Sequence, residues 1–168
     1  MARLFLKQLA GANPETTPET WVYVPYDQLN ATLGPLGALR PGQVGIVVVE
    51  SAEKASRRRY HQQKLALVLT NQRHFALEQA ERGVRVDYRF TDGPTSEALA
   101  EAAREHGPLV MMEAAERELR RDVAELVSAG ALRVVPHEGW LTTEADFDAL
   151  GEAPVSYTHL TLPTTERV

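Results

Sequence analysis

The stretch VGIVVV at residues 44–49 decides the fold. An unbroken apolar run of this length is typical of a strand that is buried on both faces of a parallel sheet. Four other segments have a β-branched, apolar or alternating pattern and are predicted to be its partner strands: residues 20–24, 84–90, 109–112 and 132–135. The sequence therefore predicts five strands.

Segments with helical periodicity separate these strands. Residues 60–82 contain neither proline nor glycine, and Gly83 is placed to end a helix there. One apolar stripe, interrupted near Gln72, runs along this segment at spacings of three and four: Leu65, Val68, Leu69, Ala76 and Ala80. We expect the stripe to pack against the sheet.

Two more helices and a short terminal helix are predicted. Either Thr95 or Ser96 is expected to cap a helix that runs to residue 107. Residues 114–129 form the next helix, with these side chains pointing inward: Leu119, Val123, Leu126 and Val127. The terminal helix contains Phe147 and Leu150 and begins after residue 142 or 143, where a threonine is available as a cap.

The alternation of strands and helices predicts the fold class. It implies right-handed crossovers and an α/β fold, namely a Rossmann-like or flavodoxin-like five-stranded parallel sheet with helices on both faces. In such sheets ligands bind at the carboxyl ends of the strands. We therefore look for candidate site residues directly after the strands.

Composition predicts the domain boundaries. Residues 1–19 are interpreted as a leader and residues 20–154 as one α/β domain. Residues 155–168 differ from the rest, and their segment VSYTHLTLPTT, written back as codons, resembles a common sequencing adapter. We expect this tail to be artefactual and the natural protein to continue past Pro154 in another sequence.

Bulk composition excludes several classes of function. The 168 residues carry a net charge of -5, so no global field attracts the chain to a nucleic-acid backbone. There is no cysteine, which rules out disulfides and thiolate metal sites and favours a cytoplasmic location. Neither a G-x-G-x-x-G motif nor a Walker-type phosphate loop is present.

Polar residues follow three of the predicted strands. Tyr26, Asp27 and Gln28 come after the first strand, and they are placed either to hydrogen-bond a polar ring or ribityl chain or to form a simple turn. Glu50 ends the second strand and Glu113 follows the fourth, so both carboxylates are expected at the same rim. There they would orient a ligand or neutralise nearby arginines.

A basic cluster precedes the long helix. It is the run RRRYH at residues 57–61, followed by Lys64. Such a cluster binds an anion at a helix N-terminus, or it is a solvated loop. The sequence contains no Ser-His-Asp set and no histidines at metal-ligand spacing, so no catalytic residue and no metal ligand is predicted.

The segments VPYDQL (24–29), VVVE (47–50), YHQQKLALVLTNQRHFALEQ (60–79), VRVDY (84–88) and VMMEAAERELR (110–120) together resemble a known family. The family is that of the iron-sulfur bacterial cryptochromes and photolyases, described as deoxyribodipyrimidine photolyase-related. The likeness runs from about residue 20 to residue 147.

The resemblance implies that this chain is the N-terminal antenna and scaffold domain of a light-dependent photolyase or cryptochrome-like flavoprotein. A lumazine-type antenna would lie at the carboxyl edge of the sheet and pass excitation to FAD in a following helical domain. That missing domain would also hold an iron-sulfur cluster and the lyase activity. The full-length protein would then repair ultraviolet lesions in damaged DNA or act as a photoreceptor.

The resemblance also implies the candidate cofactor-binding residues: Tyr26, Asp27, Gln28, Glu50, Lys54, Arg57, His61 and Glu113. Lys54 and Arg57 stand where the family has an antenna-contacting Glu and Tyr. This departure predicts either a more anionic antenna or the loss of the antenna.

Two other interpretations stay open from the sequence. The chain is a free-standing α/β protein that binds a small anionic ligand such as a nucleotide through residues 57–59, or it is a structural interaction domain that binds neither flavin, lumazine nor nucleotide.

Overall fold

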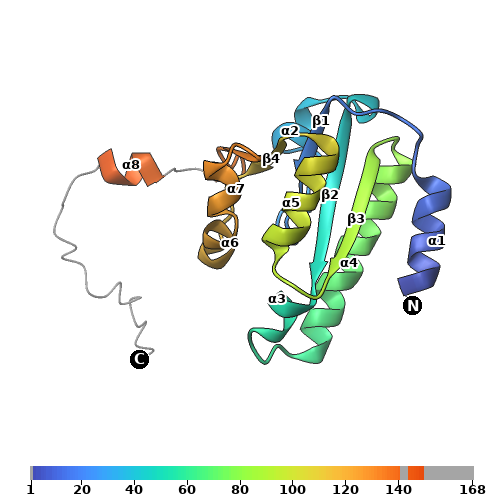
Figure 1. Cartoon of the computed structure of the whole chain (residues 1–168), viewed down its shortest axis with the longest axis horizontal. Helices are drawn as coiled ribbons and strands as arrows, with labels where there is room; N and C mark the ends of the chain where they lie inside the picture. Colours follow the sequence, from blue (N-terminus) through green and yellow to red (C-terminus); the bar gives the residue numbers. More distant parts are fainter. Residues whose placement is uncertain (1, 141–143, 150–168) are drawn as a thin grey trace, which may run out of the picture.

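The computed structural model describes residues 2–140 and 144–149. It contains a five-stranded, all-parallel sheet in the order β3-β2-β1-β4-β5 (Figure 1). The strands are β1 (Thr20–Tyr23), β2 (Val44–Ser51), β3 (Arg85–Thr91), β4 (Leu109–Met112) and β5 (Leu132–Val135). The predicted α/β class and all five predicted strands are therefore confirmed.

Helices cover both faces of the sheet. They are α1 (Ala2–Ala12), α2 (Gly34–Ala38), α3 (Ala52–Ser56), α4 (Gln62–Glu81), α5 (Thr95–His106), α6 (Arg117–Asp122), α7 (Ala124–Ser128) and α8 (Glu144–Ala149), with a 3-10 turn at Pro41–Gln43. One core cluster joins the sheet to α1, α2 and α4, and a second joins the other face to α5 and α6. No helix of the described residues is long and apolar enough to cross a membrane.

Strand β2 explains why the run at residues 44–49 is apolar throughout. Its side chains alternate between the two faces, so Ile46 and Val48 enter one cluster while Val47 and Val49 enter the other. All four are buried because helices cover both faces. The same strand therefore links the two halves of the core.

Helix α4 follows the predicted stripe in its second half. Phe75, Ala76 and Ala80 are buried against the sheet, whereas Leu65 and Leu69 near its start are only half-buried. Buried Gln72 continues the stripe, and its side-chain Nε2 donates to the Val49 carbonyl at 3.4 Å. The helix start therefore borders an opening and not the core.

Two details of the predicted helices are wrong. Within residues 114–129 the chain forms two short helices, α6 and α7, and Val127 on the second is 39% exposed and not inward. Neither Thr95 nor Ser96 caps α5; Pro94 occupies the N-cap. Thr95 is instead buried, and the Ser96 hydroxyl is 3.2 Å from an Asp122 carboxylate oxygen.

The N-terminal residues include a helix that joins the core. Residues 2–12 form α1, whose Phe5 and Leu9 are buried in the same cluster as α4. The terminal helix is present as α8, but residues 142, 143, 150 and the adapter-like tail at 155–168 lie outside the described residues.

Candidate ligand-binding site at the carboxyl edge

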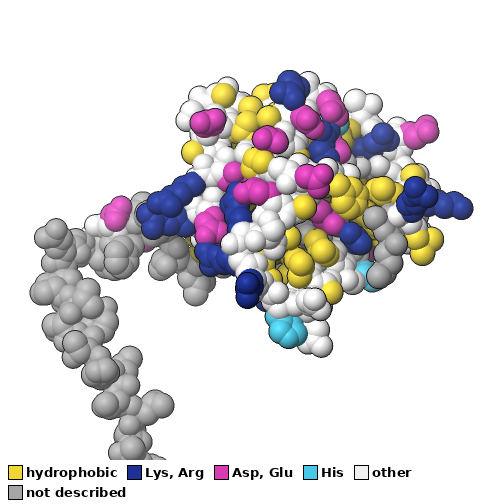
Figure 2. Space-filling model, turned by 60° about the horizontal axis from the view of Figure 1, so that its bottom comes forward, with side chains coloured by type: hydrophobic (Ala, Val, Ile, Leu, Met, Phe, Trp, Pro, Cys, Tyr) yellow, Lys and Arg dark blue, Asp and Glu magenta, His cyan; other side chains and the backbone are white. Residues whose placement is uncertain are grey.

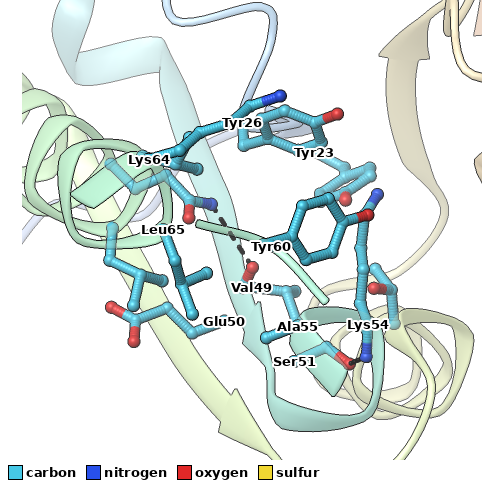
Figure 3. A pocket seen from close by; sticks show the side chains of 14 residues that line it. Tyr23, Tyr26, Val49, Glu50, Ser51, Lys54, Ala55, Tyr60, Lys64 and Leu65 are labelled. Atoms are coloured by element: carbon cyan, nitrogen blue, oxygen red, sulfur yellow. Dashed lines mark hydrogen bonds between the residues drawn. The ribbon is translucent and has the colours of Figure 1, made fainter. Parts of the chain in front are cut away.

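A cavity of about 140 Å³ opens at the carboxyl ends of β1 and β2 (Figure 3). The end of β2 meets α3 and the first half of α4 there, and the loop at residues 57–61 crosses between the two helices. The lining residues are Tyr23, Tyr26, Val49, Glu50, Ser51, Lys54, Ala55, Tyr60, Lys64, Leu65, Val68, Leu69, Gln72 and Thr95. Aliphatic and aromatic walls with a few polar groups are typical of small-molecule sites.

Tyr26 is held in place by a lysine. The Lys54 ammonium lies 4.7 Å from the centre of the Tyr26 ring and 2.5 Å from a Glu116 carboxylate oxygen. A cation over an aromatic face is attracted by the ring quadrupole, and Glu116 fixes that cation. Burial, together with the carboxylates of Glu116 and Asp27, raises the pKa of Tyr26 to about 12. Its hydroxyl therefore remains a hydrogen-bond donor at neutral pH.

Tyr23 supplies a second phenol at the cavity. Its side chain is 4% exposed, and no hydrogen-bond partner for its hydroxyl is found among the described residues. Burial, followed by the charges of Asp27 and Asp122, raises its pKa well above the usual range. Tyr23 is therefore a neutral donor that is free to bind a ligand.

Glu50 lines the cavity but is committed to neighbouring side chains. Arg73 donates to its two carboxylate oxygens at 2.6 and 2.7 Å, and the Tyr88 hydroxyl donates at 2.5 Å. Burial and this carboxylate raise the pKa of Tyr88 far above its usual range. Because a bidentate arginine neutralises it, Glu50 contributes little net charge to the cavity.

A second cavity of about 380 Å³ adjoins the first and shares with it the walls formed by Glu50, Ser51, Ala55 and Leu69. Beyond these shared residues it is lined by Ala52, Phe90, Thr91 and Asp92. Hydrophobic side chains lie among charged ones on the face of the molecule that Figure 2 shows. The two cavities together offer room for a ligand with a ring and a polar extension.

The sequence profile of the family described as deoxyribodipyrimidine photo-lyase-related protein matches residues 22–160, which include most of the described fold and every residue that lines the cavity. The chain belongs to this family. None of the curated proteins matches it.

In this photolyase-related chain, three of the predicted site residues line the cavity: Tyr26, Glu50 and Lys54. Asp27 is exposed and lies outside the lining. Gln28 in the loop that follows β1 is buried, and its Nε2 donates to the Glu113 carbonyl at 2.9 Å. The backbone of Glu113, and not its carboxylate, makes this contact.

The basic cluster of the photolyase-related chain is largely ion-paired. Arg57 is exposed and forms a bidentate pair with Glu53 at 2.9 and 3.0 Å. Arg58 pairs with Glu118. His61 accepts a hydrogen bond from the Gln63 backbone at 3.3 Å and thereby caps α4. Neither Arg57 nor His61 lines the cavity.

Tyr60 and Lys64, which the sequence placed in the basic cluster, also line the cavity. Sequence reasoning did not select several other residues that line it: Tyr23, Val49, Ser51, Ala55, Leu65, Val68, Leu69, Gln72 and Thr95. Gln72 carried a usable signal because it interrupts an apolar stripe, and a polar residue on a buried face needs a partner. The apolar lining residues carried no such signal in the sequence, because a leucine that lines a cavity has the same periodicity as a leucine in the core.

The opposite edge of the photolyase-related domain holds a charged cluster. Ligand-type atoms of Asp87, Glu105 and His106 lie within 4.8 Å of one another. The Arg89 guanidinium is 2.6 Å from the Asp87 carboxylate and 2.5 Å from that of Glu105. A fixed cation of the protein therefore already occupies the position between these carboxylates.

Proposed function

We propose that this domain binds a lumazine-type heteroaromatic chromophore in the carboxyl-edge cavity and serves as the antenna and scaffold of a light-dependent photolyase or cryptochrome-like flavoprotein. The observation that carries the proposal is a cavity with aromatic walls at Tyr26 and Tyr60, placed beside the aliphatic start of α4. Family membership supports the same assignment.

The lining suits a planar ring with hydrogen-bonding edges. Tyr26 and Tyr60 offer stacking surfaces, and Leu65 and Leu69 offer an apolar wall. Tyr23 and Gln72 place polar atoms inside the cavity. The cavity of about 140 Å³ accommodates a ring better than a whole chromophore, so a ribityl chain would extend beyond the ring toward the rim of the cavity.

The other cofactors belong to a further part of the natural protein under this proposal. The chain has no cysteine to ligate an iron-sulfur cluster, so the cluster and FAD would be held by a following helical domain. That domain would also carry the lyase chemistry and most contacts to damaged DNA. The net charge of -5 and the ion-paired arginines support this division.

A fluorescence titration with a ribityllumazine tests the proposal. We expect saturable binding by the chain, and loss of binding on Leu69→Asp because the new carboxylate enters the apolar wall of the cavity. Leu67→Asp is the matched control, since Leu67 lies two residues away on α4 and is 61% exposed. It should bind like the unmodified chain.

Circular dichroism must show both variants folded for the comparison to count. Equal binding by the two variants would show that the ligand does not bind in this cavity. Failure of the unmodified chain to bind would contradict the antenna role. Competition by a mononucleotide without a chromophore ring would favour the nucleotide-binding alternative, although Arg57 and Arg58, two of the three arginines in its basic cluster, are already engaged by carboxylates.

A further inference from the structure

We propose, on the basis of the function proposed above, that the ligand of the carboxyl-edge cavity carries a negatively charged group at its outer end, and that Lys64 selects it. The chemical class is a heteroaromatic ring whose extension ends in a phosphate or carboxylate. Lys64 would act as a specificity-determining residue.

The argument begins with the charges that line the cavity, which are Glu50, Lys54 and Lys64. Glu50 is neutralised by Arg73, with N–O distances of 2.6 and 2.7 Å. Lys54 is neutralised by Glu116 at 2.5 Å. Lys64 forms no ion pair with any described residue, so it leaves the lining with one uncompensated positive charge.

The position of Lys64 on its helix strengthens this inference. It lies in the first turn of α4, a helix of 20 residues, and that turn contains no acidic residue. The N-terminus of a helix carries a partial positive charge, so a lysine there is unfavourable and a carboxylate would be stabilising. The only side-chain cap is His61, whose ring nitrogen accepts from Gln63 at 3.3 Å. The start of α4 therefore lacks the compensating anion that it would favour.

A separate observation points to a ligand in the same cavity. The Tyr23 hydroxyl lines the cavity on a side chain that is 4% exposed, and it has no partner among the described residues. The hydroxyl itself is not fully buried, so it can donate to a polar ligand group in the cavity. Tyr23 thus supplies a donor inside the cavity, while Lys64 supplies the charge at its rim.

The geometry places the anion at the outer end of the ligand. Lys64 is exposed, and in Figure 3 its side chain extends from α4 toward Tyr26. The carboxylates that act most strongly on Tyr26 are Glu116, which Lys54 engages, and Asp27, which is exposed. The cation responsible for anion selectivity is therefore Lys64, and not Lys54 or Arg57.

Riboflavin and FMN form a suitable pair of probes because they differ by one phosphate. We expect the chain to bind FMN about tenfold or more tightly than riboflavin, as one charge-assisted contact allows. Lys64→Gln should reduce FMN affinity to the riboflavin level and leave riboflavin unchanged. Lys64→Arg should keep the preference, and added salt should weaken it.

Lys7→Gln is the matched control, because Lys7 is exposed on α1 and the substitution removes the same charge away from the cavity. It should preserve the preference for FMN. Equal affinity of the unmodified chain for the two probes would overturn the role of Lys64 and leave the chromophore site in place. Binding of neither probe, nor of a ribityllumazine, would overturn the site itself. If Lys64→Gln does not fold, a salt-independent preference in the unmodified chain and in Lys64→Arg would refute the proposal.

Discussion

Lys54 illustrates how a single contact changes the role of a residue. The family resemblance placed it at an antenna-contacting position and so implied a more anionic antenna or the loss of the antenna, yet its ammonium lies between Glu116 and the Tyr26 ring. A pair this close leaves little free positive charge, and it fixes the orientation of the tyrosine. Lys54 is therefore a positioning residue, and Tyr26 is the group that faces the cavity.

Tyr26 makes stability depend on alkaline pH. Its pKa rises from 10.0 to about 12 in the folded chain, mainly because of burial. Below pH 10.0 the phenol is protonated in both the folded and the unfolded chain, so it adds no pH dependence to the free energy of unfolding. Above pH 10.0 the Tyr26 phenol ionises first in the unfolded chain, so the free energy of unfolding falls as pH rises from 10.0 to about 12.

We therefore expect Tyr26→Phe to lose less unfolding free energy than the unmodified chain when pH is raised from 10.0 to about 12. Tyr60→Phe, in which a half-buried tyrosine of the same cavity is changed, is the comparison. Urea unfolding at several pH values measures both. Parallel curves for the unmodified chain and Tyr26→Phe would show that burial does not hold this proton.

At the scale of elements, the exposed edge of the sheet is covered by a side chain. Strand β3 is an edge strand, and the Asn13 amide just after α1 both donates to the Val86 carbonyl and accepts from its N–H, each at 2.8 Å. Arg85 also donates to the Pro14 carbonyl. The Asn13 amide thus makes the two hydrogen bonds that a residue of a neighbouring strand would make, and it prevents another strand from pairing with β3 at Val86.

Asn13→Ala should lower the unfolding free energy by about 1–3 kcal/mol, because two backbone groups lose their partner. It should also increase self-association, since the β3 edge becomes free to pair. Asn71→Ala, on the exposed side of α4, is the control. Urea unfolding and light scattering measure the two effects. An Asn13→Ala chain as stable and monomeric as the control would mean that α1 alone protects the edge.

At the scale of the whole molecule, β2 joins the two core clusters. Ile46 belongs to the cluster on the α4 face, and Trp21 belongs to the one on the α5 face. The neighbouring strands β1 and β2 place Trp21 beside Gly45, and a Cβ on Gly45 would be 2.7 Å from the indole. Because β2 contributes side chains to both clusters, we expect the two faces to unfold together.

Ile46→Ala should lower the free energy of unfolding by about 2–5 kcal/mol. The decrease measured by Trp21 fluorescence should equal the decrease measured by circular dichroism. A Trp140→Phe background leaves Trp21 as the one tryptophan of the chain. Separate transitions for the two signals would show that the faces unfold independently.

Most of the fold was predictable because its signals are local. Each strand has its own apolar or alternating run, and Gly83 ends α4 in the left-handed conformation with a φ of 89°. The break between α6 and α7 and the packing of α1 were not predictable. Both depend on which neighbouring surface is available, and periodicity does not contain that information.

The candidate site was predictable only in part. The residues expected at strand ends include Tyr26 and Glu50, which do meet at the cavity, and they also include Asp27, which points to solvent. Gln28 closes the crevice between β1 and β4, where strand order reverses and where a ligand would be expected. The cavity lies one strand away, over β1 and β2.

By itself, the sequence determined the parallel α/β architecture and the family, because hydrophobic periodicity and short motifs are properties of contiguous segments. Only the tertiary structure decided which charges are free. Lys54, Arg57 and Lys64 are all cationic side chains close together in sequence. Glu116 from a distant segment neutralises Lys54, Glu53 and the distant Asp122 engage Arg57, and Lys64 has no ion pair within the part of the chain that the structure describes. Electrostatic pairing depends on distances of a few ångströms between elements, and these distances exist only after the chain has folded.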